Sequence, residues 1–108
     1  MRDIKHMNII KKEEKIMYEN KKIFILGLAR SGYEVAKVLA KHNNEIMLSD
    51  KQKKDEDKIR ELVDLGAKVV ITDYPQQYFD ESYDLVVKNP GIKYDHPLLE
   101  KAREYGIP

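Results

Sequence analysis

Short apolar runs recur along this chain and alternate with segments whose apolar residues return every three or four positions. The runs at residues 22–26, 45–49, 68–72 and 83–87 have the length of buried strands. Between and after them, the helical period predicts helices over residues 31–42 and 55–65, a single turn near 76–79, and a last helix from about 97 to 106. The pattern therefore predicts strands and helices in regular alternation.

This alternation is typical of an α/β protein with a parallel sheet and right-handed crossovers. We expect a Rossmann-like, doubly wound parallel sheet in a single three-layer domain, because 108 residues suffice for one core. The chain ends at Ile107-Pro108, where the pattern requires another strand, so we expect a truncated final strand and a longer parent protein. Residues 1–20 are rich in Lys and Glu and predict a charged N-terminal extension, followed by the domain at 21–108.

Charge and composition exclude several classes of function. The chain has 20 Lys and Arg against 19 Asp and Glu, for a net charge of +1, whereas a nucleic-acid binder usually carries a basic excess. Its longest apolar run, residues 23–29, is far shorter than the roughly 20 residues of a membrane span. There is no cysteine, and the N-terminus lacks the apolar core of a secretion signal. We expect a cytoplasmic protein with no nucleic-acid partner, no membrane partner and no metal site.

A glycine-bracketed turn, Gly27 to Gly32, follows the first predicted strand and leads directly into a helix. It fits the dinucleotide fingerprint with Ala29 at the middle glycine, and an alanine methyl there hinders the closest approach of a diphosphate. It also fits the glycine spacing of a P-loop, but Tyr33-Glu34 replaces the required Lys-Ser/Thr, so it is not an ATP-hydrolysing loop. The turn either holds a phosphate on helix N–H groups or serves packing alone.

Two further polar segments follow predicted strands. Asp50 closes the second strand, where a carboxylate can accept hydrogen bonds from a ribose or a pyrimidine N–H, or act simply as a turn residue. Asn89-Pro90-Gly91 follows the fourth strand and turns bare backbone toward the same edge. Ligands of open α/β sheets bind outside the carboxyl ends of the strands, so these loops predict one binding rim. His96, before Pro97 at the start of a helix, is expected to be a capping or packing residue.

A series of motifs carries a family resemblance over about residues 21–108. In order they are Ile-Leu-Gly-Leu-Ala-Arg-Ser-Gly at 25–32, Ile-Met-Leu-Ser-Asp at 46–50, Val-Val-Lys-Asn-Pro-Gly-Ile at 86–92, Asp-His-Pro at 95–97, Lys-Ala-Arg at 101–103 and Gly-Ile-Pro at 106–108. The series resembles the N-terminal domain of the Mur ligase family, in its branch that joins D-glutamate to UDP-N-acetylmuramoyl-L-alanine. The resemblance implies a domain that binds the UDP part of that substrate during peptidoglycan synthesis.

The same resemblance assigns roles to residues. Backbone at Ala29, Arg30, Ser31 and Gly32 would hold the diphosphate; Asp50, Lys51 and Gln52 would meet the uracil; and Asn89, Pro90 and Gly91 would close the opposite wall. It implies no catalytic residue and no metal ligand in this chain, which alone is expected to be an inactive monomer. ATP, Mg²⁺ and D-glutamate are expected to bind in other domains of the full-length ligase.

The sequence also departs from the family pattern. Ala29 stands where glycine is frequent, Asn89 where serine is frequent, and Lys51-Gln52 differs from the common uracil loop. Two alternatives share the glycine turn and Asp50: an NAD(P)-binding domain of a dehydrogenase or redox-sensing regulator, and an interaction module of Rossmann-like shape that binds no nucleotide.

Overall fold

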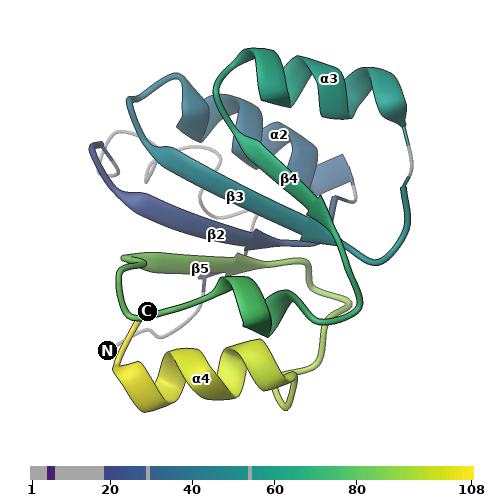
Figure 1. The fold of residues 1–108 in the computed structure, drawn as a ribbon. Coiled ribbons are helices and arrows are strands. Elements are labelled where there is room, and N and C mark those ends of the chain that lie inside the picture. Colours follow the sequence, from purple (N-terminus) through teal and green to yellow (C-terminus); the bar gives the residue numbers. More distant parts are fainter. Residues whose placement is uncertain (1–4, 7–18, 29, 54) are drawn as a thin grey trace.

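The computed structural model describes residues 5–6, 19–28, 30–53 and 55–108 of the chain. Its strands are β1 (Lys5–His6), β2 (Lys22–Leu26), β3 (Glu45–Asp50), β4 (Lys68–Ile71) and β5 (Leu85–Lys88). Its helices are α2 (Arg30–Ala40), α3 (Glu56–Asp64), the 3-10 turn η2 (Pro75–Tyr78) and α4 (Pro97–Tyr105). The strands form one sheet in the order β1-β5-β2-β3-β4, and every pair is parallel (Figure 1).

The sheet is the middle of three layers, which confirms the Rossmann-like α/β prediction. Helices α2 and α3 lie on one side of it, and α4 and η2 lie on the other (Figure 1). Ile23 and Ile25 of β2 belong to the core cluster under α2 and α3, whereas Phe24 and Leu26 belong to the cluster under α4. Because successive strand residues point to opposite faces, one five-residue strand supplies both cores.

The strand order creates a crevice between β2 and β5. From β2 the chain moves outward through β3 to β4 and then returns to place β5 on the other side of β2. The crossovers that leave β2 and β5 therefore diverge to opposite faces, and their loops separate at this point. It is the position where open α/β sheets bind ligands.

The structure also differs from the predicted elements. The fourth strand begins at Leu85 rather than at 83, because the chain is still in a turn there, with the Tyr83 N–H donating to the Asp80 carbonyl (3.4 Å). The segment predicted as an extension contributes β1, which pairs with β5 in the register Lys5↔Val87. The Pro108 carbonyl accepts a hydrogen bond from the Val86 N–H (2.8 Å), so the end of this chain also reaches β5.

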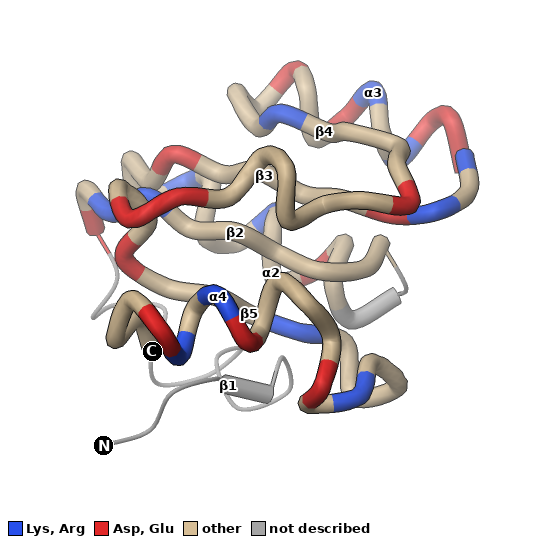
Figure 2. The backbone as a smooth tube through the Cα atoms, turned by 60° about the horizontal axis from the view of Figure 1, so that its bottom comes forward, with Lys and Arg blue, Asp and Glu red and all other residues tan. Residues whose placement is uncertain are grey.

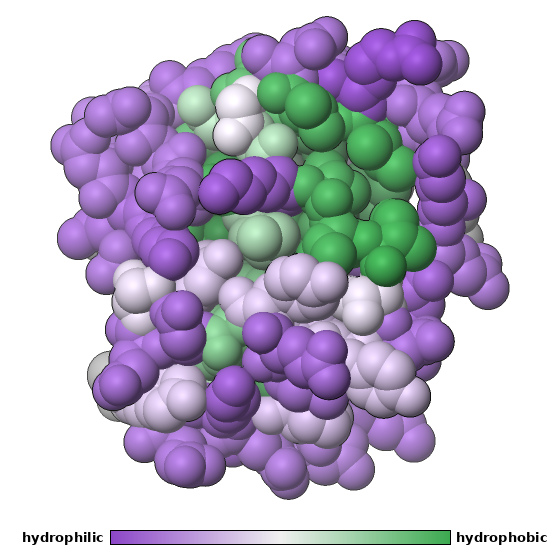
Figure 3. All heavy atoms as spheres, viewed as in Figure 1, coloured by the Kyte–Doolittle hydropathy of each residue, from purple (hydrophilic) through white to green (hydrophobic). Residues whose placement is uncertain are grey.

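The surface reflects the composition. Basic and acidic residues are interspersed along α3, α4 and the loops (Figure 2). Apolar side chains gather along β4, the edge strand, where Ile71 remains 39% exposed (Figure 3). The connection from β4 to β5 contains only the single turn η2, which covers less of the sheet than a full helix does. In the described part of the chain, no helix combines the length and the apolar content of a membrane span.

Candidate functional site

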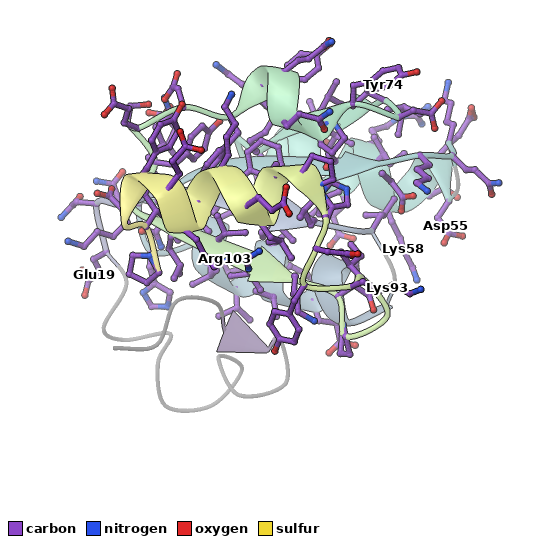
Figure 4. All side chains as sticks on the ribbon, turned by 90° about the horizontal axis from the view of Figure 1, so that it is seen from below. Glu19, Asp55, Lys58, Tyr74, Lys93 and Arg103 are labelled. Atoms are coloured by element: carbon purple, nitrogen blue, oxygen red, sulfur yellow. The ribbon has the colours of Figure 1, made fainter. Side chains whose placement is uncertain are left out.

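A cavity of about 580 Å³ lies at the carboxyl ends of β2, β3, β4 and β5. Asp55, Tyr74 and Lys93 lie around this end of the molecule in Figure 4. The residues that line the cavity come from the loops after all four strands and are Leu26, Gly27, Leu28, Ser49, Asp50, Lys51, Asp55, Thr72, Pro75, Asn89, Gly91, Ile92, Lys93, Asp95 and His96. A single concave site therefore collects the loops that the sequence predicted to form one rim.

The glycine corner at the end of β2 is fitted closely against the loop after β5. Gly27 has a φ of +102°, which favours glycine, and its N–H donates to the Ser49 carbonyl (2.8 Å). A Cβ at this position would lie 3.0 Å from Cβ of Asn89 and 3.7 Å from Cδ1 of Ile92. The lack of a side chain at Gly27 thus allows the two loops of the crevice to meet.

Asp50 links the glycine corner to the end of β3. Its Oδ2 accepts a hydrogen bond from the Leu28 N–H (2.8 Å), and its Oδ1 accepts from the N–H groups of Lys51 (2.6 Å) and Gln52 (3.4 Å). An ionised carboxylate has about four acceptor positions, so capacity for a ligand donor remains. Its first effect is structural, because it fixes two loops of the rim to each other.

The loop after β5 is held by its own short hydrogen bonds. The Asn89 N–H donates to the Leu26 carbonyl (3.0 Å), which continues the sheet into the loop. The Asn89 side chain accepts from the Gly91 N–H (3.1 Å), and the Asn89 carbonyl accepts from the Ile92 N–H (2.9 Å). This Asx turn fixes the wall of the cavity that faces Gly27.

His96 is the N-cap of α4, as the sequence predicted. Its Nδ1 accepts a hydrogen bond from the Leu98 N–H (3.0 Å), and its half-buried ring lines the cavity. Burial and the nearby Lys51 cation lower the pKa of His96, while the Asp95 carboxylate opposes that shift. The imidazole is therefore held in its neutral form more strongly than a free histidine.

The structure brings together some of the predicted site residues and not others. Asp50, Lys51, Asn89 and Gly91 line the cavity, whereas the neighbouring Gln52 and Pro90 are exposed and do not line it. Arg30 and Ser31 begin α2, Gly32 is buried within it, and Ala29 lies outside the described residues. Whether any of them contacts a ligand stays a prediction.

Sequence reasoning gave no binding role to several further residues that line the cavity, among them Asp55, Thr72, Pro75 and Lys93. Thr72 directly follows β4, so the rule about carboxyl ends of strands would have found it. Its N–H donates to the Asp50 carbonyl (2.8 Å), and its Oγ1 accepts from the Tyr74 N–H (3.0 Å). Among the described residues, no three His, Cys, Asp or Glu side chains gather in a group that could hold a metal ion.

Comparison with known proteins gives a consistent family. A family model described as Mur ligase MurD-like, N-terminal domain, matches residues 21–108. A UDP-N-acetylmuramoylalanine–D-glutamate ligase of Lactobacillus johnsonii is 46% identical over 93 residues, which cover 84% of this chain and 20% of that protein. The ligase of the same name from Enterococcus hirae is 43% identical over 91 residues, which cover 83% and 20% respectively. The chain spans about a fifth of the length of the curated relatives it matches.

Solved structures share the fold at low sequence identity. The translation initiation factor eIF-2B of Pyrococcus horikoshii superposes with a TM-score of 0.65 at 14% identity, over 94% of this chain and 43% of that one. L-tryptophan dehydrogenase of Nostoc punctiforme gives 0.51 at 19% identity, over 76% and 23%. Likeness at these identities concerns the Rossmann-like architecture alone. The match over residues 21–108 goes further, and by it the chain belongs to the family of Mur ligase MurD-like N-terminal domains.

Proposed function

We propose that this chain binds the UDP part of UDP-N-acetylmuramoyl-L-alanine, as the N-terminal part of a ligase that adds D-glutamate to that substrate in peptidoglycan synthesis. The observation that carries the proposal is the cavity at the carboxyl edge, where the Gly27 corner, Asp50-Lys51 and the Asn89 turn meet. Its volume of about 580 Å³ lies within the range of about 300–1,000 Å³ that is usual for small-molecule sites. The relatives at 43–46% identity are named for this reaction.

The hydrogen bonds of the corner suggest how the diphosphate is held. The N–H groups of Gly27 and Leu28 are already bonded to Ser49 and Asp50. The first N–H groups of a helix have no intrahelical acceptor, so those of Arg30, Ser31 and Gly32 at the start of α2 are the natural donors to phosphate oxygens. The Lys51 and Lys93 ammonium groups add positive charge at the same cavity.

The uracil belongs on the β3 side of the cavity in this proposal. Asp50 keeps acceptor capacity for the ring N–H, with Lys51 and Gln52 beside it and Thr72 at the neighbouring strand end. Asn89 and Gly91, with Pro90 between them, form the opposite wall. The base is thereby enclosed between the loops that follow β3 and β5.

The remaining chemistry belongs to other parts of the ligase. The corner does not fit an ATP site, because Tyr33-Glu34 stands where the phosphate lysine and the magnesium hydroxyl must follow. We propose that ATP and Mg²⁺ act elsewhere to activate the substrate carboxylate as an acyl phosphate, which the amine of D-glutamate then attacks. We propose that this chain alone is inactive and contributes substrate binding, and that it is cytoplasmic and monomeric.

Titration of the chain with UDP and with NADH tests the proposal. We expect UDP to bind, and the amide signals that move in NMR spectra to cluster at residues 27–32, 50–52 and 89–91. NADH should bind far more weakly, because the Ala29 methyl occupies the middle glycine position of the dinucleotide fingerprint. Tight NADH binding without a response to UDP would instead identify a nicotinamide domain, and no response to either would identify an interaction module.

A further inference from the structure

His96 occupies two environments at once. One edge of its ring caps α4, where Nδ1 accepts a hydrogen bond from the Leu98 N–H (3.0 Å). The ring also lines the cavity at the carboxyl edge, together with the Gly27-Leu28 corner that leads into α2. A side chain whose only task is capping needs no contact with the cavity, and Ser, Asn or Asp caps helices at least as well.

The cap determines which ring nitrogen carries the proton. A nitrogen that accepts a hydrogen bond uses its lone pair, so Nδ1 is unprotonated while it bonds the Leu98 N–H. In a neutral imidazole the proton then resides on Nε2, and His96 is a fixed Nε2–H donor. The two ring nitrogens point in widely different directions, so the Nε2–H is directed away from the Leu98 N–H, and the residue that carries it lines the cavity.

The charges around His96 favour an anionic acceptor. Lys51 lies close enough for its cation to lower the pKa of the imidazole, and Lys93 lines the same cavity. Asp95 and Asp55 supply the opposing carboxylates at this edge, and the Asp50 carboxylate is engaged with backbone N–H groups. A neutral donor beside two ammonium groups suits a phosphate oxygen, since it adds a hydrogen bond without a further charge to desolvate.

We propose that His96, held as its Nε2–H tautomer by the cap on Leu98, donates a hydrogen bond to an anionic oxygen of the diphosphate bound in this cavity. This inference rests on the proposed function and assigns a ligand-binding role to a residue that the sequence analysis expected to serve capping or packing. It makes the start of α4 a second place, opposite the start of α2, from which the diphosphate is oriented.

Two substitutions separate binding from capping. His96→Ser keeps a good N-cap but removes the ring nitrogen, whereas His96→Ala removes both. We expect His96→Ser to retain nearly the unfolding midpoint of the unaltered chain and to bind UDP about 10- to 100-fold more weakly, as expected for one lost hydrogen bond to a charged group. Both affinities are measured by calorimetric titration. In the same experiment uridine, which has no phosphate, should bind His96→Ser and the unaltered chain equally.

Each other outcome contradicts the inference. If His96→Ser binds UDP as well as the unaltered chain does and only His96→Ala is impaired, the residue acts through the helix cap alone. If uridine affinity falls as much as UDP affinity, His96 does not act through the diphosphate. A nitrogen–proton correlation spectrum that shows the Nδ1–H tautomer at neutral pH overturns the geometry without any ligand. Absence of UDP binding by the unaltered chain refutes the proposed function, and the inference falls with it.

Discussion

Replacing Gly27 with alanine tests how closely the glycine corner must fit the Asn89 turn. Gly27 has a φ of +102°, and an added Cβ would lie 3.0 Å from Cβ of Asn89. That Asn89 atom is attached directly to the backbone, so it cannot rotate away and one strand end has to shift. A left-handed backbone costs a non-glycine residue about 1–2 kcal/mol, and overpacking adds about 1–3 kcal/mol. We expect Gly27→Ala to lower the free energy of unfolding by about 2–5 kcal/mol.

The chain supplies its own control for the backbone cost. Gly66 has a φ of +100°, and a Cβ there would have no atom within 4 Å. Gly66→Ala therefore carries the cost of the positive φ without the contact. Urea unfolding followed by circular dichroism should show Gly27→Ala to be less stable than Gly66→Ala by about 1–3 kcal/mol, the overpacking contribution.

A double-mutant cycle identifies the atom responsible. Asn89→Gly removes the Cβ that Gly27→Ala would meet, whereas Asn89→Ala keeps it. The added cost of Gly27→Ala should shrink in the Asn89→Gly background and persist in the Asn89→Ala background. The reasoning about the crevice is refuted if Gly27→Ala costs no more than Gly66→Ala, or if both backgrounds give the same coupling.

Three further predictions concern the site, the core and the sheet edge. Asp50→Ala should lower the free energy of unfolding, measured by urea titration, by about 1.5–3 kcal/mol, since it removes the carboxylate that accepts three backbone N–H groups. The control Gln52→Ala should change the same free energy by less than about 0.5 kcal/mol. Burial raises the pKa of Tyr83 to about 12, so its hydroxyl loses the proton at a higher pH in the folded than in the unfolded chain. The free energy of unfolding should therefore be unaffected below about pH 10 and fall as the pH rises toward 12. Urea titrations between these pH values should show a smaller fall for Tyr83→Phe. The Val86 N–H faces the outer edge of β5 and the Asn89 N–H the inner edge, so the alternation of a strand turns the Lys88 N–H toward β1. The register Lys5↔Val87 then turns the Lys5 N–H toward β5 and the His6 N–H away from it, so Lys5→Pro should speed hydrogen exchange at Lys88 relative to His6→Pro; equal rates in the two variants would contradict the pairing.

The main elements were predictable because the chain buries them in a regular way. The strand β2 reads as a continuous apolar run because its residues supply cores on both faces of the sheet. The same principle does not reveal β1, because its residues Lys5–His6 carry no apolar pattern and the pairing with β5 is made by the backbone. The apolar run also did not show where β5 begins, because Tyr83 is buried like a strand residue while its N–H still belongs to the turn at Asp80.

The candidate site was predictable as an edge but not as a set of side chains. The rule that ligands bind beyond the carboxyl ends of strands selected the loops after β2, β3 and β5, and it applies equally to Thr72 after β4. Lys93 and Asp55 lie several residues beyond a strand, where only the path of the loop brings them to the cavity. Loop paths depend on contacts between segments distant in sequence, and no local period encodes them.

The sequence correctly places Asp50 at the candidate site, but it does not show whether Asp50 contacts a ligand or positions the loops around it. A carboxylate at a strand end suggests direct contact with a ligand, yet Asp50 already accepts the N–H of Leu28 from the loop after the neighbouring strand β2. Removing it would displace the corner that leads into α2, and the proposed diphosphate donors would move with that corner. Weaker UDP binding by an Asp50 variant is therefore evidence for recognition of the base only if the Leu28 amide stays as protected from exchange as in the unaltered chain. If that protection is lost, the same weakening reports the position of the corner.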